Sequence, residues 1–138
     1  MQFRVRDWMI DLVVFVDPDA PVTEALATMR RRYINSVIVN KTETNPEYGI
    51  LTSTDISDKI VAKERNPEEV KVREIMTSPL ITVPLDMSIF ECARLMNEHR
   101  IHHLPVVDDH GAVIGMISAT DFLVVAEAMG HKGDRSLS

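Results

Sequence analysis

Two short segments of this chain combine hydroxyl and carboxylate side chains at the same spacing. Each consists of glycine, two apolar residues, Thr or Ser, a variable residue, Thr and Asp, and the segments are residues 49–55 and 115–121. The hydroxyls of Thr52 and Ser118 can donate hydrogen bonds to phosphate oxygens, whereas the carboxylates of Asp55 and Asp121 can accept them from two vicinal ribose hydroxyls. Each segment therefore offers partners for both polar parts of a nucleotide.

The same pattern is also typical of an ordinary helix start. In each copy the segment joins an expected strand to an expected helix, and a helix N-terminus attracts phosphate through its free N–H groups and partial positive charge. Thr54 and Thr120 can instead cap the helix, with Asp55 and Asp121 stabilising its first turn. The matching spacing in both copies favours ligand binding, although duplication would preserve a structural cap equally well.

A histidine cluster, with His99, His102 and His103, precedes the apolar run at residues 104–107. Imidazoles can contact phosphate and change charge near neutral pH. On one helix face the spacing i, i+3, i+4 would also suit a metal ion, and ordinary surface histidines are a third interpretation. Because the apolar run predicts that the helix ends before His103, the sequence predicts no metal site.

Composition and charge restrict the class of protein. The net charge is −6 and the isoelectric point is near 5.3, which argues against a nucleic-acid partner because such proteins carry a basic footprint. The single cysteine, Cys92, forms no intramolecular disulfide and falls on an expected apolar helix stripe. The apolar stretch at residues 12–16 is far shorter than the roughly 18–20 residues of a membrane span. We therefore expect a cytoplasmic protein without membrane contact.

No recognisable catalytic constellation is present in the sequence. It contains neither a Gly-x-Ser-x-Gly elbow nor a Walker-type phosphate loop, and no carboxylate pair lies near a plausible base. A metal-dependent hydrolase built on the histidines fits poorly because no Asp or Glu ligand has motif spacing. We expect no catalytic residue.

The chain repeats itself, and this repeat sets the elements that position these residues. An offset of 67 residues superimposes residues 5–39 on 72–106, and after one slip an offset of 66 superimposes 49–55 on 115–121. The repeat assigns residues 1–66 to a first copy and 67–130 to a second, with a flexible tail at 131–138. Copies of this size bury too little surface alone. We therefore expect their apolar sheet faces to pack together with pseudo-twofold symmetry, leaving two equivalent clefts.

Both copies predict the same order of elements. A helical turn (5–9, 72–76) is followed by an extended segment (13–16, 80–83), an amphipathic helix, two strands (36–40 and 49–52; 103–107 and 112–117) and a closing helix near Thr54 and Thr120. Asp19 and Asp86 are expected at the N-caps of the amphipathic helices, with Pro21 in the first turn of the first one.

These ordered motifs resemble CBS domains, a tandem pair of which is called a Bateman module. The resemblance rests on the early Val-Arg-x-x-Met turn, the amphipathic helix, the Leu-Pro-Val-Val strand and Gly-x-x-Ser/Thr-x-x-Asp, and it covers residues 5–130. It implies an α/β (α+β) fold of two β-α-β-β-α units packed sheet to sheet, with AMP, ADP, ATP or S-adenosylmethionine in the clefts and no required cofactor.

The resemblance also implies roles for individual residues. Asp55 and Asp121 would bind ribose, whereas Thr52 and Ser118, with Thr54 and Thr120 beside them, would face phosphate. The extended segments, including Val14 and Ile81, would line the base pocket.

The histidine segment is similar to the regulatory subunits of AMP-activated protein kinase, in which the second His and the following Arg reach nucleotide phosphates. His102 and His103 occupy those positions here, so a permanent charge is replaced by a titratable one and phosphate affinity is expected to rise as pH falls. The first copy has Asn35 and Ser36 instead, which predicts asymmetric sites.

We therefore expect a non-catalytic, nucleotide-responsive regulatory module that forms a homodimer and acts on an enzyme or transporter. The alternative is a structural or interaction homodimer whose clefts hold no ligand, with Phe15 or Met116 filling the base pocket and the Asp residues serving as caps.

Overall fold

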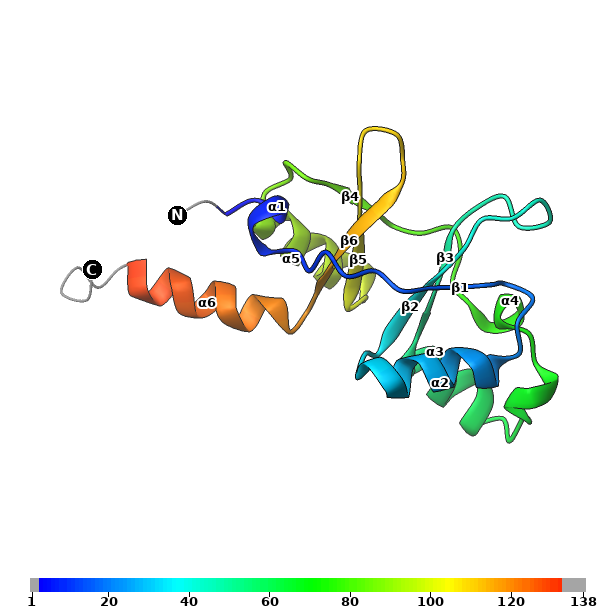
Figure 1. Cartoon of the computed structure of the whole chain (residues 1–138). Helices are drawn as coiled ribbons and strands as arrows, with labels where there is room; N and C mark the ends of the chain where they lie inside the picture. The colour runs from blue at the N-terminus through cyan, green and yellow to red at the C-terminus, as the bar shows by residue number, and fades with distance from the viewer. Residues whose placement is uncertain (1–2, 133–138) are drawn as a thin grey trace. The chain divides into compact units, whose positions relative to one another are not determined.

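The computed structural model describes residues 3–132, with side chains up to Gly130. The chain divides into two compact units, each with one three-stranded sheet (Figure 1). The central unit is Val14–Leu80, and the terminal unit joins the described residues before Val14 to those from Ile81 onward. The mixed α and β fold class predicted from the sequence is confirmed.

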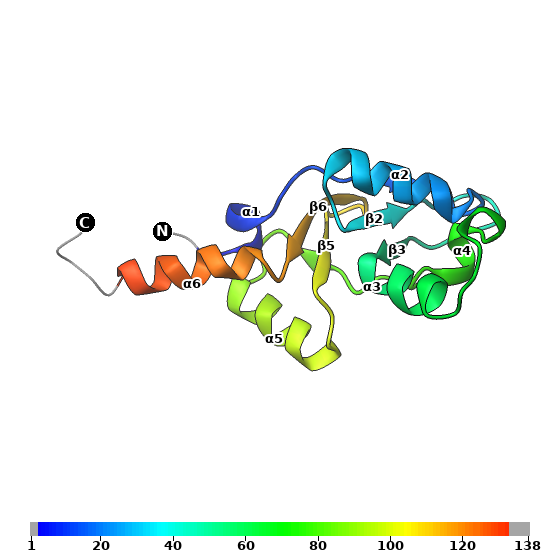
Figure 2. The same cartoon turned by 90° about the horizontal axis from the view of Figure 1, so that it is seen from below.

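The central unit contains six labelled elements: β1 (Phe15–Val16), α2 (Val22–Arg32), β2 (Ser36–Val39), β3 (Gly49–Thr52), α3 (Ser53–Ile56) and α4 (Val72–Ile75). A π-helical segment, Ser57–Val61, continues α3, and a 3-10 turn, Pro67–Glu69, precedes α4. Strand β2 is central, parallel to β1 and antiparallel to β3. Figure 2 shows α2 and α3 beside β2 and β3.

The terminal unit repeats this plan with α1 (Val5–Trp8), β4 (Val83–Pro84), α5 (Ile89–His99), β5 (His103–Val107), β6 (Val113–Ser118) and α6 (Asp121–Lys132). Strand β5 is central, parallel to β4 and antiparallel to β6. The internal repeat is therefore present in the strand topology as well as in the sequence.

The short helices α1 and α4 pack into the unit that is formed mainly by the other repeat. The Val5 N–H donates to the Met87 carbonyl at 2.9 Å, and the equivalent Val72 N–H donates to the Ala20 carbonyl at 2.9 Å. Helix α1 contacts α5, beside which Figure 1 draws it. The boundaries of the compact units therefore differ from those of the sequence repeats, which were predicted at 1–66 and 67–130. The short helix of each repeat belongs to the unit that holds the strands of the other repeat.

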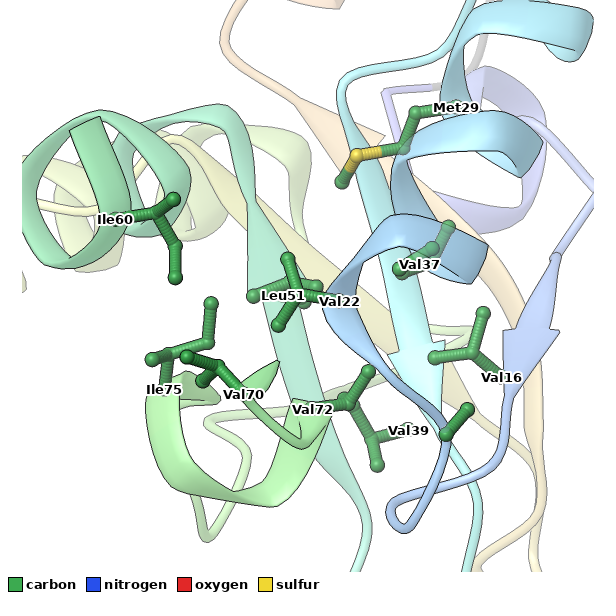
Figure 3. Packing of buried hydrophobic residues seen from close by; sticks show 12 residues of the cluster. Val16, Val22, Met29, Val37, Val39, Leu51, Ile60, Val70, Val72 and Ile75 are labelled. Atoms are coloured by element: carbon green, nitrogen blue, oxygen red, sulfur yellow. The ribbon is translucent and has the colours of Figure 1, made fainter. Parts of the chain in front are cut away.

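Each unit has its own apolar core. In the central unit, Val22 and Met29 from α2 converge with Leu51 from β3, Ile60 from the π-helical segment and Ile75 from α4 (Figure 3). The terminal core contains Val5, Val83, Ile89, Cys92, Met96, Leu104, Val106, Ile117 and Val125. Full burial of such aliphatic side chains contributes about 1.5–3 kcal/mol each. The amphipathic stripes predicted from the sequence supply much of both cores.

The predicted N-caps at Asp19 and Asp86 are wrong. Helix α2 begins after Pro21, and α5 begins after Ser88, whose hydroxyl accepts the Phe90 N–H at 3.2 Å. The carboxylates instead pair with the arginines of the short helices. Arg73 Nη2 lies 2.8 Å from Asp19 Oδ1, and Arg6 pairs with Asp86. A long-range charged partner thus replaces the local cap.

The closing helix of the second copy is longer than the sequence predicted. Helix α6 continues through Gly130 to Lys132, so residues 131 and 132 of the predicted flexible tail are helical. The rest of that tail, residues 133–138, lies outside the described residues.

Candidate ligand-binding site

The Thr/Ser-x-x-Asp segments lie where β3 runs into α3 and where β6 runs into α6. Thr52 is the N-cap of α3. Its hydroxyl accepts the Asp55 N–H at 3.4 Å, while Asp55 Oδ2 accepts the Thr52 N–H at 2.9 Å. This is a capping box, in which two otherwise unpaired donors are satisfied reciprocally. The prediction that Thr54 caps this helix is therefore wrong, because the helix begins one residue before it.

The second copy has the corresponding contacts of the acid. Asp121 Oδ2 accepts the Ser118 N–H at 2.7 Å and the Ser118 hydroxyl at 3.2 Å. The Ser118 and Thr120 hydroxyls are 2.9 Å apart. Both acids thus use one oxygen to accept the N–H three residues earlier, and in the first copy this contact is part of a capping box.

The other oxygen distinguishes the two acids. Asp55 is only 7% exposed, and its Oδ1 lies 2.9 Å from Lys59 Nζ. Asp121 is half-buried, and its Oδ1 has no hydrogen-bond or ion-pair partner among the described residues. Sequence reasoning missed Lys59, although its i, i+4 spacing from Asp55 was a usable signal.

The three histidines lie in different secondary structure: a helix end, a connecting segment and a strand. Helix α5 ends at His99, with Arg100 in the left-handed conformation (φ 54°) after it, and His103 begins β5. The His102 carbonyl accepts the Ala119 N–H at 2.9 Å, and His103 pairs with Ser118 in the sheet. The histidines therefore share no helix face. In residues 3–130 no three His, Cys, Asp or Glu side chains gather as metal ligands.

Burial lowers the pKa of His103. The nearby His102 lowers this pKa further, and Asp121 partly offsets the shift. The influence of Asp121 is consistent with the sheet register, which brings β5 and β6 together at this end. A lowered pKa keeps the His103 imidazole neutral near pH 7. The charge gain predicted from the sequence therefore requires a lower pH than an ordinary histidine would.

The extended segments contribute different backbone groups in the two units. The Val14 carbonyl accepts the Ile38 N–H at 2.8 Å. Pro105 stands at the position of Ile38 in the second copy and carries no N–H. Throughout the described chain, no group donates a hydrogen bond to the Ile81 carbonyl. The terminal unit thus has an additional acceptor.

The sheet registers bring the predicted residues together within each unit. Val83 pairs with Val106, and His103 with Ser118, so Ile81 precedes β4 at the end of the sheet that carries His103 and Ser118. The terminal unit therefore carries Ile81, His102, His103, Ser118, Thr120 and Asp121, and the central unit carries Val14, Thr52, Thr54 and Asp55.

Comparison with known proteins identifies the family. The CBS domain family matches residues 5–62 and again residues 72–127. The chain therefore belongs to the CBS domain family and carries two CBS domains, which confirms the resemblance in the sequence motifs.

Relatives and solved structures agree with this assignment. An uncharacterized protein of Methanopyrus kandleri is 38% identical over 113 residues, which are 82% of this chain and 57% of that protein, so the chain spans just over half of that relative. A hexameric CBS-CP12 protein from bloom-forming cyanobacteria is 31% identical with a TM-score of 0.83, covering 89% of this chain and 67% of that one.

A third comparison concerns a ligand complex. The CBS domain pair of protein MJ0100, solved with 5′-methylthioadenosine and S-adenosyl-L-methionine, is 27% identical with a TM-score of 0.77, covering 88% of this chain and 98% of that one.

Among the helices of the described residues, none has the length and apolar character needed to cross a membrane.

Proposed function

We propose that this chain is a non-catalytic regulatory module that binds an adenosyl ligand: AMP, ADP, ATP, S-adenosylmethionine or a close relative. The proposal rests on one observation. One end of the β4-β5-β6 sheet carries Asp121 Oδ1 and the Ile81 carbonyl, which have no hydrogen-bond partner among the described residues, and the imidazoles of His102 and His103.

These groups match the parts of an adenosyl compound. Asp121 Oδ1 can accept hydrogen bonds from ribose hydroxyls while Oδ2 keeps its contact with the Ser118 N–H. The Ile81 carbonyl can accept from the amino group of adenine. The hydroxyls of Ser118 and Thr120, with His102, can contact phosphate or another polar substituent at the start of α6.

The ligand class has support from a related protein. The CBS domain pair of MJ0100 was solved with 5′-methylthioadenosine and S-adenosyl-L-methionine, both of which carry a 5′-deoxyadenosyl group. Those compounds lack phosphate, so a neutral His103 is compatible with this class. Charged AMP, ADP and ATP remain within the proposal because His102 is exposed and lies beside the same strand end.

The proposed mechanism is a population shift, in which ligand binding favours one of the module's pre-existing conformations. In this proposal the module is a homodimer in the cytoplasm, and its conformational change alters the activity of an enzyme or transporter that it binds. The net charge of −6 argues against a nucleic-acid partner, because phosphate groups are bound by basic surfaces.

The capping contacts support a second candidate function, an interaction module without a ligand. The box formed by Thr52 and Asp55 explains these residues without a nucleotide. The two functions differ in what Asp121 contributes: under the first, its substitution reduces ligand affinity, whereas under the second it changes stability alone.

The test has two stages. Freshly purified protein is denatured and any released small molecule is identified by mass spectrometry. The wild type and Asp121→Asn are then titrated calorimetrically with AMP, ADP, ATP, S-adenosylmethionine and 5′-methylthioadenosine. Asn keeps an oxygen that can accept the Ser118 N–H, so we expect a small change in melting temperature and about tenfold or greater loss of affinity. Equal affinity in the variant and the wild type would contradict the proposed site.

A further inference from the structure

We infer that only the terminal unit binds the adenosyl ligand, because Lys59 acts as an internal substitute for the ligand in the central unit. This inference rests on the proposed function. It adds a stoichiometry of one ligand per chain and names Lys59 as the residue that determines this stoichiometry.

Both oxygens of the Asp55 carboxylate have partners inside the central unit. Its Oδ2 accepts the Thr52 N–H at 2.9 Å and the Thr52 hydroxyl at 3.3 Å, and its Oδ1 contacts Lys59 Nζ at 2.9 Å. The acid is 7% exposed. A ribose hydroxyl at Oδ1 would have to compete with this ammonium group for an acid that is largely removed from water.

Lys59 is held at a second point. Its Nζ also donates to the Ile75 carbonyl at 2.8 Å, at the end of α4. Lys59 belongs to the π-helical segment Ser57–Val61, a local widening of the helix that often marks a functional position. The ammonium group thus bridges the acid and a backbone acceptor of the same unit.

The described residues of the terminal unit form no equivalent of this bridge. Val125 occupies the position that corresponds to Lys59, and its side chain is buried in the core. In the described chain no cation pairs with Asp121. Two sites derived from one repeat therefore differ in whether the acid is available.

The backbone gives an independent reason for the same assignment. The Val14 carbonyl is already bonded to the Ile38 N–H at 2.8 Å, whereas Pro105 offers no such donor to the Ile81 carbonyl. In the central unit both acceptors that an adenosine would use therefore already have a partner, whereas in the described part of the terminal unit neither has one.

The test is the stoichiometry of binding, measured by calorimetry with AMP, ATP, S-adenosylmethionine and 5′-methylthioadenosine as separate probes. We expect one equivalent per chain for the wild type, with this equivalent weakened by Asp121→Asn and unchanged by Asp55→Asn. Lys59→Gln should add a second, weaker equivalent, because Oδ1 becomes available while the Val14 carbonyl stays engaged. Adding Asp55→Asn to Lys59→Gln should remove it.

Two matched controls separate the contact from charge and folding. Lys59→Arg keeps the ion pair and should retain one equivalent, and Lys63→Gln removes an exposed charge nearby and should also leave one. Circular dichroism and thermal unfolding confirm that each variant is folded. Two equivalents in the wild type, or a folded Lys59→Gln with only one, would overturn the inference and leave the proposed function standing. Absence of binding for all four probes would overturn both.

Discussion

The sulfur of Met76 lies directly against Gly49, so close that a Cβ added to this glycine would sit 2.6 Å from Met76 Sδ. Met9 and Gly115 repeat the relationship with the same distance of 2.6 Å. In both cases the methionine follows a short helix from one repeat, and the glycine begins or interrupts a strand of the other. The methionine motif of each repeat thus meets the glycine motif of the other repeat.

This contact predicts that Gly115→Ala destabilises the protein. The new methyl group would contact Met9 Sδ and lie 3.1 Å from the Ile10 carbonyl, and overpacking of this kind costs about 1–3 kcal/mol. Because the methionine end is flexible, Met9→Ala in the same chain should restore part of the loss. Chemical denaturation of the two variants and the wild type measures both effects.

Gly130→Ala is the control for that experiment. Gly130 lies in α6, and no atom of the described residues lies within 4 Å of the position where its Cβ would be. Alanine should stabilise the helix there by about 0.5–1 kcal/mol. Equal destabilisation at Gly115 and Gly130 would contradict the packing explanation.

The unequal environments of the two acids predict unequal stability effects without ligand. Asp55→Asn removes the buried charge that pairs with the partly exposed Lys59 and should cost about 1–3 kcal/mol. Among the described residues Asp121 has no such cation partner, so Asp121→Asn weakens only the contacts with Ser118 and should cost under about 1 kcal/mol. Urea unfolding at pH 7 measures both, and an equal loss in the two variants would contradict the special role of Lys59.

The sequence predicted the strands well because both copies carry the same alternation and turn signals. Strands β3 and β5 have the bounds expected from the repeat, Gly49–Thr52 and His103–Val107. The exchange of short helices was not predictable in this way. Helices α1 and α4 have equivalent sequences and make equivalent hydrogen bonds, so the pattern alone does not tell which unit each one joins.

The residue types of the candidate site were predictable from the sequence. Whether each acid and carbonyl already has a partner within the protein was not. The Thr/Ser-x-x-Asp spacing identified Asp55 and Asp121 equally. Their difference depends on where the Lys59 ammonium lies and on a hydrogen bond that Pro105 removes. The substitution of Ile38 by proline is visible in the sequence, yet its effect on the Ile81 carbonyl follows only from the strand register.

Cys92 should be unreactive in the folded protein. Burial raises the pKa of its thiol to about 11, and Glu91 adds to this shift. Because the thiolate is the reactive form, reaction with a disulfide reagent at pH 8 should follow unfolding rather than direct attack. Reaction rates measured across a urea series test this, and rapid labelling without denaturant would contradict it.

The same raised pKa predicts a loss of stability at alkaline pH. The folded state keeps Cys92 protonated, so its contribution is fully present below the unfolded pKa and is lost as pH rises towards about 11. Other groups titrate in this range, so the informative quantity is the difference from Cys92→Ala. Between pH 8 and pH 10 the wild type should lose about 1 kcal/mol more than the variant.

His103 should destabilise the ligand-free protein as pH falls. Its pKa is lowered in the folded state, mainly by burial and then by His102, so the unfolded chain binds the proton more readily. The free energy of unfolding should therefore begin to fall below the ordinary histidine pKa of about 6.5, and it should continue to fall until the folded imidazole is itself protonated. Above that range His103 makes no pH-dependent contribution. Asp121, which favours the charged imidazole, limits the size of the effect.

The measurement compares unfolding of the wild type and His103→Gln at pH 7.5 and pH 5.5. Glutamine keeps a polar side chain without a titration, so the fall in stability should be smaller in the variant, and NMR titration of the imidazole should give a pKa below the ordinary value. Added ATP should reverse the trend, because an anion beside the imidazole favours its charged form and affinity would then increase as pH falls. A pKa at or above the ordinary histidine value would contradict the burial argument. Loss of the ATP pH dependence in His103→Gln, but not in His110→Gln on the exposed turn after β5, would assign the effect to the end of the sheet that carries Asp121.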